Sequence, residues 1–135
     1  MKLVAGLGFR AGCELASLRS ALQAALDAAS TARGRTITPA HLSTLAAAAD
    51  KTNHPALLQL AGELQVPIHT IPLTALANQP AAPSAHVPER YGAHSVAEAA
   101  ALAAAGAGAT LLGHRSISPD RMATAALASI ENTAP

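Results

Sequence analysis

The first fourteen residues join an apolar run to closely spaced glycines, and this combination limits the possible folds. Residues 3–7 are apolar without alternation, which is typical of a strand buried on both faces of a parallel sheet. Gly6 lies within this run and Gly8 and Gly12 follow it, and glycine permits positive φ and a close approach of the main chain to a neighbour. Glu14 then opens a helix. The stretch therefore predicts a strand, a glycine turn and a helix.

The glycine turn has two interpretations. In the first, free N–H groups and the dipole at the helix start bind an anion. Arg10 then adds a bidentate donor for carboxylate or phosphate, and Phe9 lies against a flat apolar partner. In the second, the turn only connects strand to helix, and Phe9 packs under the sheet. The spacing G-x-G-x-x-x-G is not the dinucleotide fingerprint G-x-G-x-x-G, and the residues leave both interpretations open.

Length and composition predict a single domain over residues 1–135. About a quarter of the residues are alanine, and there is one Phe, one Tyr and no Trp, so the helices should lie close to the sheet. A formal net charge of +1 without any Lys/Arg run argues against a nucleic-acid partner.

The single cysteine excludes an internal disulfide. No signal peptide, lipidation motif or apolar run of membrane-spanning length occurs in the sequence, which predicts a cytoplasmic protein with no membrane partner. Alanine-rich helix surfaces would permit a homodimer.

Apolar periodicity and helix start signals predict the elements of the first half. A one-sided amphipathic helix covers residues 15–29, and Thr38-Pro39 begins a single helical turn. Residues 42–49 are interpreted as the second strand. Pro55 begins the next helix, and residues 66–71 form the third strand.

The second half begins with prolines and ends with strands. Residues 73–77 predict a short helical turn, and residues 79–92 predict a lid-like excursion. A capping box at Ser95 and Glu98 starts a helix that Gly106 ends. Residues 109–112 then predict a fourth strand, residues 113–120 a polar turn, and residues 122–130 a closing strand, with a terminal helix as its competitor.

These elements predict an α/β fold: a three-layer open sheet, mostly parallel, with an antiparallel closing edge strand and helices on both faces. In such sheets, ligands bind beyond the carboxyl ends of the parallel strands. The segments there supply several cations and few acids, so they should attract a polyanion, although loops are also simply where charged residues lie. The candidate ligand-binding residues are Gly8, Phe9, Arg10, Gly12, Lys51, His54, Arg90, Ser95, His114 and Arg115.

Standard catalytic and metal signatures are missing. The six histidines form no H-x-x-x-H pair and there is no C-x-x-C, so neither a metal site nor a cofactor is predicted. The candidates for general acid or base catalysis are His54, His94 and His114. Cys13 at a helix start would have some thiolate character, but the sequence places no base beside it.

Three segments together resemble a known family. They are residues 4–12, residues 51–58 with 64–67, and the run Ser-Val-Ala-Glu-Ala-Ala-Ala-Leu at 95–102. Over nearly the whole chain the sequence is similar to the CobE and CbiG C-terminal domain family of cobalamin biosynthesis. It departs from the usual family pattern in having His54 in place of an acid, Phe9 in place of a Cys, and His114-Arg115 in place of a Lys.

The resemblance implies a role in making the corrin ring of vitamin B12. The ligand would be a precorrin-type tetrapyrrole. This protein would bind it as a carrier or as a hydrolase-like partner in the aerobic pathway, and other cobalamin-pathway enzymes would be further partners. Fused relatives resemble a hydrolase that opens the δ-lactone of cobalt-precorrin-5A and releases acetaldehyde. The alternative from a different class is a nucleotide-binding α/β domain that uses the Gly6–Gly12 turn for phosphates.

Overall fold

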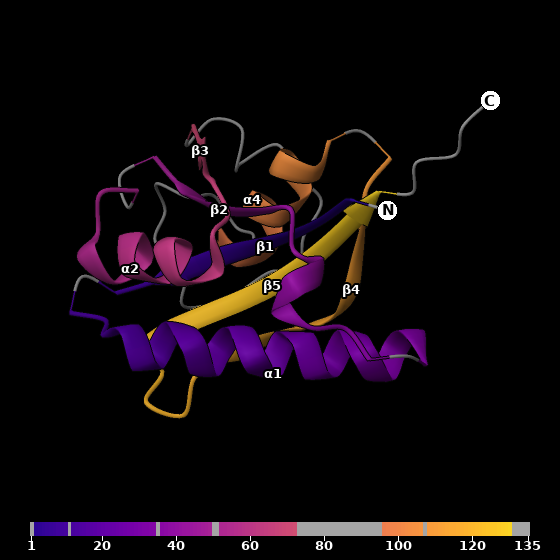
Figure 1. Ribbon diagram of the computed structural model, residues 1–135, viewed down its shortest axis with the longest axis horizontal. Helices are drawn as coiled ribbons and strands as arrows, with labels where there is room; N and C mark the ends of the chain where they lie inside the picture. Colours follow the sequence, from indigo (N-terminus) through magenta and orange to yellow (C-terminus); the bar gives the residue numbers. More distant parts are fainter. Residues whose placement is uncertain are drawn as a thin grey trace.

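The computed structural model describes residues 2–10, 12–34, 36–49, 52–72, 96–106 and 108–130. These residues form an open sheet with helices on both faces (Figure 1). The elements in chain order are β1 Lys2–Phe9, α1 Leu15–Arg33, η1 Pro39–His41, β2 Thr44–Ala48, α2 Pro55–Leu64, β3 Ile68–Ile71, α4 Val96–Ala105, β4 Thr110–Ile117 and β5 Ala123–Ile130.

The described strands lie in the order β3-β2-β1-β5-β4. β1, β2 and β3 are parallel, and β5 is antiparallel to both of its neighbours, β1 and β4. Four strands therefore run in one direction and β5 in the other. The prediction of an open, mostly parallel α/β sheet with one antiparallel strand and helices on both faces is confirmed.

The position of the antiparallel strand differs from the prediction, because β5 lies inside the sheet and not at its edge. Residues 123 and 125–129 of β5 are buried, and only Thr124 and Ile130 are partly exposed. A strand buried on both faces needs neighbours on both sides as well as helices above and below. β4 carries the exposed residues Thr110 and Ile117 and borders β5 on the far side from β1.

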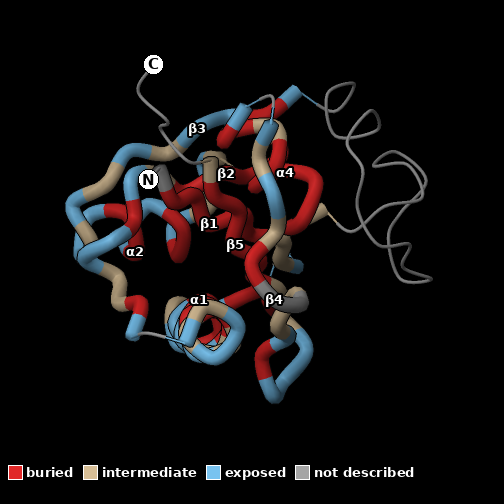
Figure 2. Tube along the Cα trace, turned by 90° about the vertical axis from the view of Figure 1, so that its right-hand side faces the viewer, coloured by how far each residue is buried: buried red, intermediate tan, exposed pale blue. Residues whose placement is uncertain are grey.

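One face of the sheet is built from large side chains. Leu3, Leu7 and Leu45 are fully buried in a core cluster that includes the inner faces of α1 and α2. Leu127 of β5 belongs to the same cluster. Figure 2 shows the buried strands between α1 on one side and α4 on the other. Branched side chains therefore fill the space between the sheet and α1 and α2.

The opposite face is covered by α4 and has mostly small residues, with Ala46, Ala48 and Ala128 beside Val4 and Ile71. A Cβ atom added to Gly6 would lie 2.0 Å from the carbonyl oxygen of Ala97 and 2.6 Å from the nitrogen of Ala101. The main chain of α4 therefore rests directly on β1. The prediction of helices lying close to the sheet is confirmed for this face, because alanine and glycine leave no thicker layer between them.

The fourth strand is longer than predicted. β4 continues through Gly113 to Ile117, with a register irregularity against β5 between Leu112 and Ser116. The prediction of a polar turn over residues 113–120 is therefore wrong for its first half. Main-chain pairing with β5 continues whatever the polarity of the side chains, so the end of the apolar run did not mark the end of the strand.

Several local signals are confirmed. Pro39 begins the short helical turn after Thr38, and Pro55 begins α2. Gly106, with φ of 102°, follows the end of α4, and residues 123–130 form a strand and no terminal helix. The predicted turn at 73–77 and excursion at 79–92 lie outside the described residues. No helix of the described part of the chain is both long and apolar enough to cross a membrane.

Candidate ligand-binding site

The carboxyl end of β1 brings together several of the predicted site residues. We call the group of Gly8, Phe9, Arg10 and His54 the β1 edge. Gly8 faces the start of α4, because a Cβ added to it would lie 3.5 Å from the Cβ of Val96. Phe9 turns to the other face, where it packs against the core under α1 and α2. The β1 edge thus lies between the first turns of two helices on opposite faces.

Arg10 is the exposed cation of this edge. Its main-chain N–H donates to the carbonyl oxygen of Met122 at 2.9 Å, which ties the end of β1 to the start of β5. The side chain is exposed and makes no hydrogen bond or ion pair with the described residues. The main chain of Arg10 is thus fixed while its guanidinium is exposed. Such a guanidinium can bind a carboxylate through two parallel hydrogen bonds.

His54 connects the edge to α2. Its ring lies edge-on to Phe9, with centroids 5.0 Å apart and an interplanar angle of 76°. Its Nδ1 accepts a hydrogen bond from the N–H of Ala56 at 3.2 Å, so the side chain caps the helix. Pro55 at the first helical position fixes φ and needs no hydrogen-bond partner for its nitrogen. The sequence pair His-Pro thus positions both the helix start and the imidazole.

Arg115 is not in a loop at the end of a strand. It lies within β4, between Leu112 and Ser116. These two residues pair with residues of β5 that in turn pair with Ala5 and Leu7 of β1. Its Nη1 donates to Oε1 of Glu98 at 3.1 Å, and Glu98 is only 4% exposed. Much of the charge of Arg115 is therefore used to compensate a buried carboxylate in the first turn of α4.

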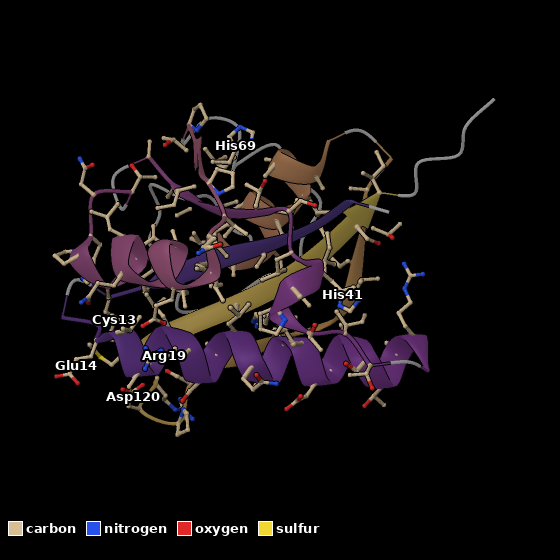
Figure 3. All side chains as sticks on the ribbon, viewed as in Figure 1. Cys13, Glu14, Arg19, His41, His69 and Asp120 are labelled. Carbon is tan, nitrogen blue, oxygen red and sulfur yellow. The ribbon has the colours of Figure 1, made fainter. Side chains whose placement is uncertain are left out.

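A second polar group ties the turn between β4 and β5 to the start of α1. Asp120 accepts hydrogen bonds from the hydroxyl groups of Ser118, at 2.6 Å, and Ser17, and from the N–H of Met122 at 3.0 Å. These donors, that of Ser118 foremost, hold the pKa of the Asp120 carboxyl below its usual value. Figure 3 places Asp120 near Cys13 and Glu14, at one end of α1.

The prediction of thiolate character for Cys13 is wrong. The thiol is 5% exposed, and its Sγ donates to the carbonyl oxygen of Glu14 at 3.4 Å. Burial, and then the negative charge of Asp120, raise the pKa of the Cys13 thiol. A protonated, buried thiol is a poor nucleophile. Asp120 was not among the predicted site residues, although Ser118-Pro119-Asp120 directly before a strand is a typical turn sequence.

The other predicted residues contribute less to the described geometry. Gly12 is exposed beside the β1 edge, with Met122 Cε 3.5 Å from a Cβ added to it. His114 lies in β4, but its side chain is outside the description. Outside the described residues altogether are Lys51, Arg90, His94 and Ser95.

Two glycines of the predicted phosphate-binding turn lie within a strand. Gly6 and Gly8 are part of β1, and α4 occupies the space beside them. The described glycines with positive φ are Gly34, Gly106 and Gly108, far along the chain from this turn. Close approach at Gly6 therefore serves helix packing and leaves no room for a phosphate. Within the described ranges, no three His, Cys, Asp or Glu residues are grouped to hold a metal ion.

Comparison with known proteins gives a consistent family assignment. Residues 3–128 match the family model described as "Cobalamin synthesis G C-terminus". The crystal structure of CobE, a protein from the cobalamin (vitamin B12) biosynthetic pathway, is 37% identical in sequence, with a TM-score of 0.77; the match covers 96% of this chain and 91% of that one. The cobalamin biosynthesis protein chiG from Agrobacterium tumefaciens is 34% identical, with a TM-score of 0.64 and coverage of 96% and 99%.

A more distant structure shares the fold alone. It is a cobalamin biosynthesis protein G homolog from Sulfolobus solfataricus, 19% identical, with a TM-score of 0.70 over 97% of this chain and 37% of the other. No curated protein matches the chain.

Proposed function

Since the chain belongs to the cobalamin synthesis G C-terminal family, and so to the cobalamin biosynthesis pathway, we propose that it binds a corrin-ring precursor at the β1 edge. Such a precursor is a flat macrocycle that carries many carboxylates. A binding site for it needs a cation for the carboxylates and an apolar surface beside the ring. The β1 edge has both, from adjacent residues of one strand end.

The observation that carries the proposal is the exposed guanidinium of Arg10 next to Phe9. Phe9 is partly exposed and held by the edge-on ring of His54, and Arg10 is held through its main chain. Because both residues lie at the end of a buried strand, little main-chain freedom is lost when a ligand binds. A hydrogen bond from Arg10 to a carboxylate should contribute about 1.5–3 kcal/mol.

The role that this geometry favours is that of a carrier that holds and passes on an intermediate. The described residues of the β1 edge offer a cation, an aromatic ring and an imidazole. The nearby thiol of Cys13 is buried and its pKa is raised, which disfavours a covalent step there. Hydrolysis of a lactone on the ring is the competing role, and it is an outcome of the test below.

The test is titration of the protein with hydrogenobyrinic acid, followed by visible absorbance. We expect saturable binding, weakened at least about tenfold in Arg10→Ala, as the loss of a charge-assisted hydrogen bond predicts. Arg19→Ala is the matched control, since Arg19 is also exposed but is paired with Glu63 between α1 and α2. This variant should bind as the unchanged protein does.

Three results would contradict the proposal or change its form. Absence of binding, or equal binding by Arg10→Ala, would remove the β1 edge as the site. Tight binding of ATP or NAD with no response to the corrinoid would replace the ligand class. A change of mass in a precorrin incubated with the protein would show a hydrolase and not a carrier.

A further inference from the structure

The cap that His54 forms also determines which of its nitrogens carries the ring proton. The N–H of Ala56 donates to Nδ1 at 3.2 Å, and an atom that accepts such a bond must present a lone pair. The proton of the neutral ring is therefore on Nε2.

We propose that His54 contributes to the β1 edge as a hydrogen-bond donor through Nε2–H, and that it is neither a general base nor an acceptor. The inference rests on the proposed function, because the partner of Nε2–H would be a carboxylate or carbonyl oxygen at the rim of the corrin precursor. Whatever Nε2–H contacts before the ligand arrives, the ring offers a donor, and binding exchanges one acceptor for another.

The cap explains why the ring does not act as a base. In the neutral ring a base would have to use the lone pair of Nδ1, and that lone pair already accepts the N–H of Ala56. Donation from Nε2–H leaves the cap of α2 intact.

The surroundings of the ring fix the direction of this donor. Pro55 restricts the main chain after His54, Nδ1 is held by Ala56, and the ring stands edge-on to Phe9 at 5.0 Å. A donor that is oriented before the ligand binds costs less entropy than a mobile one. The edge should therefore select ligands with an oxygen acceptor near the apolar contact on Phe9.

The first experiment measures the tautomer directly. Long-range ¹H–¹⁵N spectra of the ¹⁵N-labelled protein, with the His54 signals assigned by their loss in His54→Ser, should show a proton on Nε2 and none on Nδ1. Addition of hydrogenobyrinic acid should shift the Nε2 and Nε2–H signals and leave Nδ1 unprotonated. A proton on Nδ1 in the free protein would overturn the proposal.

The second experiment separates the donor from the cap. His54→Ser keeps an oxygen that can cap α2 and removes the ring, whereas His54→Ala removes both. We expect His54→Ser to lose only the ring contact with Phe9, and so less stability in urea than His54→Ala, and to bind hydrogenobyrinic acid about tenfold more weakly. His54→Ala should lose binding to a similar extent and also lose stability.

The outcomes separate this inference from the function on which it rests. If Arg10→Ala weakens binding and His54→Ser does not, the donor role is overturned while the proposed function stands. If the unchanged protein does not bind the corrinoid, the proposed function fails and the ligand contact of His54 fails with it.

Discussion

The two faces of the sheet are packed in opposite ways. Toward α1 and α2, the strands present Leu3, Leu7 and Leu45, which fill the interface with large side chains. Toward α4, they present several alanines beside Val4 and Ile71, and at Gly6 the main chains of β1 and α4 touch. Leu7 should therefore be sensitive to loss of volume and Gly6 to any gain, because packed interiors tolerate neither voids nor overlap.

The largest effect is expected from adding volume at Gly6. In Gly6→Val the new Cβ would overlap main-chain atoms of Ala97 and Ala101, which cannot rotate away as a side chain can. We expect a loss of more than about 4 kcal/mol, beyond the usual cost of overpacking, measured by urea unfolding.

A glycine in open space is the control for that variant. Gly62 lies in α2 and has nothing within 4 Å of an added Cβ. Gly62→Ala should stabilise the protein by about 0.5–1 kcal/mol, since alanine favours the helix. Equal stability of Gly6→Val and the unchanged protein would refute the main-chain contact between β1 and α4.

Removing volume tests the other face. Leu7 is 1% exposed and lies in the core under α1 and α2, so Leu7→Ala should cost about 3 kcal/mol through lost burial and a cavity. Leu58 is 50% exposed on α2, and Leu58→Ala should cost less than about 1 kcal/mol. Similar losses at the two leucines in chemical denaturation would contradict the packed core.

The ion pair on the α4 face should have an intermediate effect. Arg115→Met leaves the carboxylate of Glu98 buried without its partner, at a cost of about 2 kcal/mol, less than for a fully buried pair because Arg115 is 28% exposed. The double variant Arg115→Met with Glu98→Gln should recover part of that loss in thermal unfolding. An additive double variant would show that the two groups do not interact.

The smallest effect is a change in acid sensitivity on the α1 side. The pKa of Asp120 is lowered in the folded protein, mainly by the Ser118 hydroxyl, so the unfolded chain takes up this proton first. The stabilisation is complete above the ordinary value for Asp of about 3.9 and is lost as the pH falls through the folded value. Asp120→Asn should flatten the decline of stability below about pH 4.

The control for that experiment is Asp27→Asn. Asp27 is exposed on α1 and accepts a hydrogen bond from Gln23 at 3.0 Å. At pH 7 this exposed substitution should change the free energy of unfolding by less than about 0.5 kcal/mol. A decline in Asp120→Asn as steep as in the unchanged protein would assign the acid sensitivity to other carboxyl groups.

The predicted residues that lie close together are those beside a strong local signal. Phe9 and Arg10 end a buried strand, and His54 precedes a helix-starting proline, so local sequence sufficed to predict their shared edge. Arg115 was predicted to lie in a loop because the run of apolar residues ends before Gly113. The strand continues beyond Gly113 because its main chain still pairs with β5. The link from Asp120 to α1 was not predicted because its partner there, Ser17, is distant in sequence.

The amino-acid sequence alone determined the family, the α/β class and the starts of most elements, because these depend on apolar runs, prolines and caps that act over a few residues. Tertiary structure alone decided that β5 lies inside the sheet, that Gly6 serves contact with α4, and that Arg115 binds Glu98. Each of these depends on which distant segments become neighbours, and that is decided by the packing of the whole core and not by any local preference.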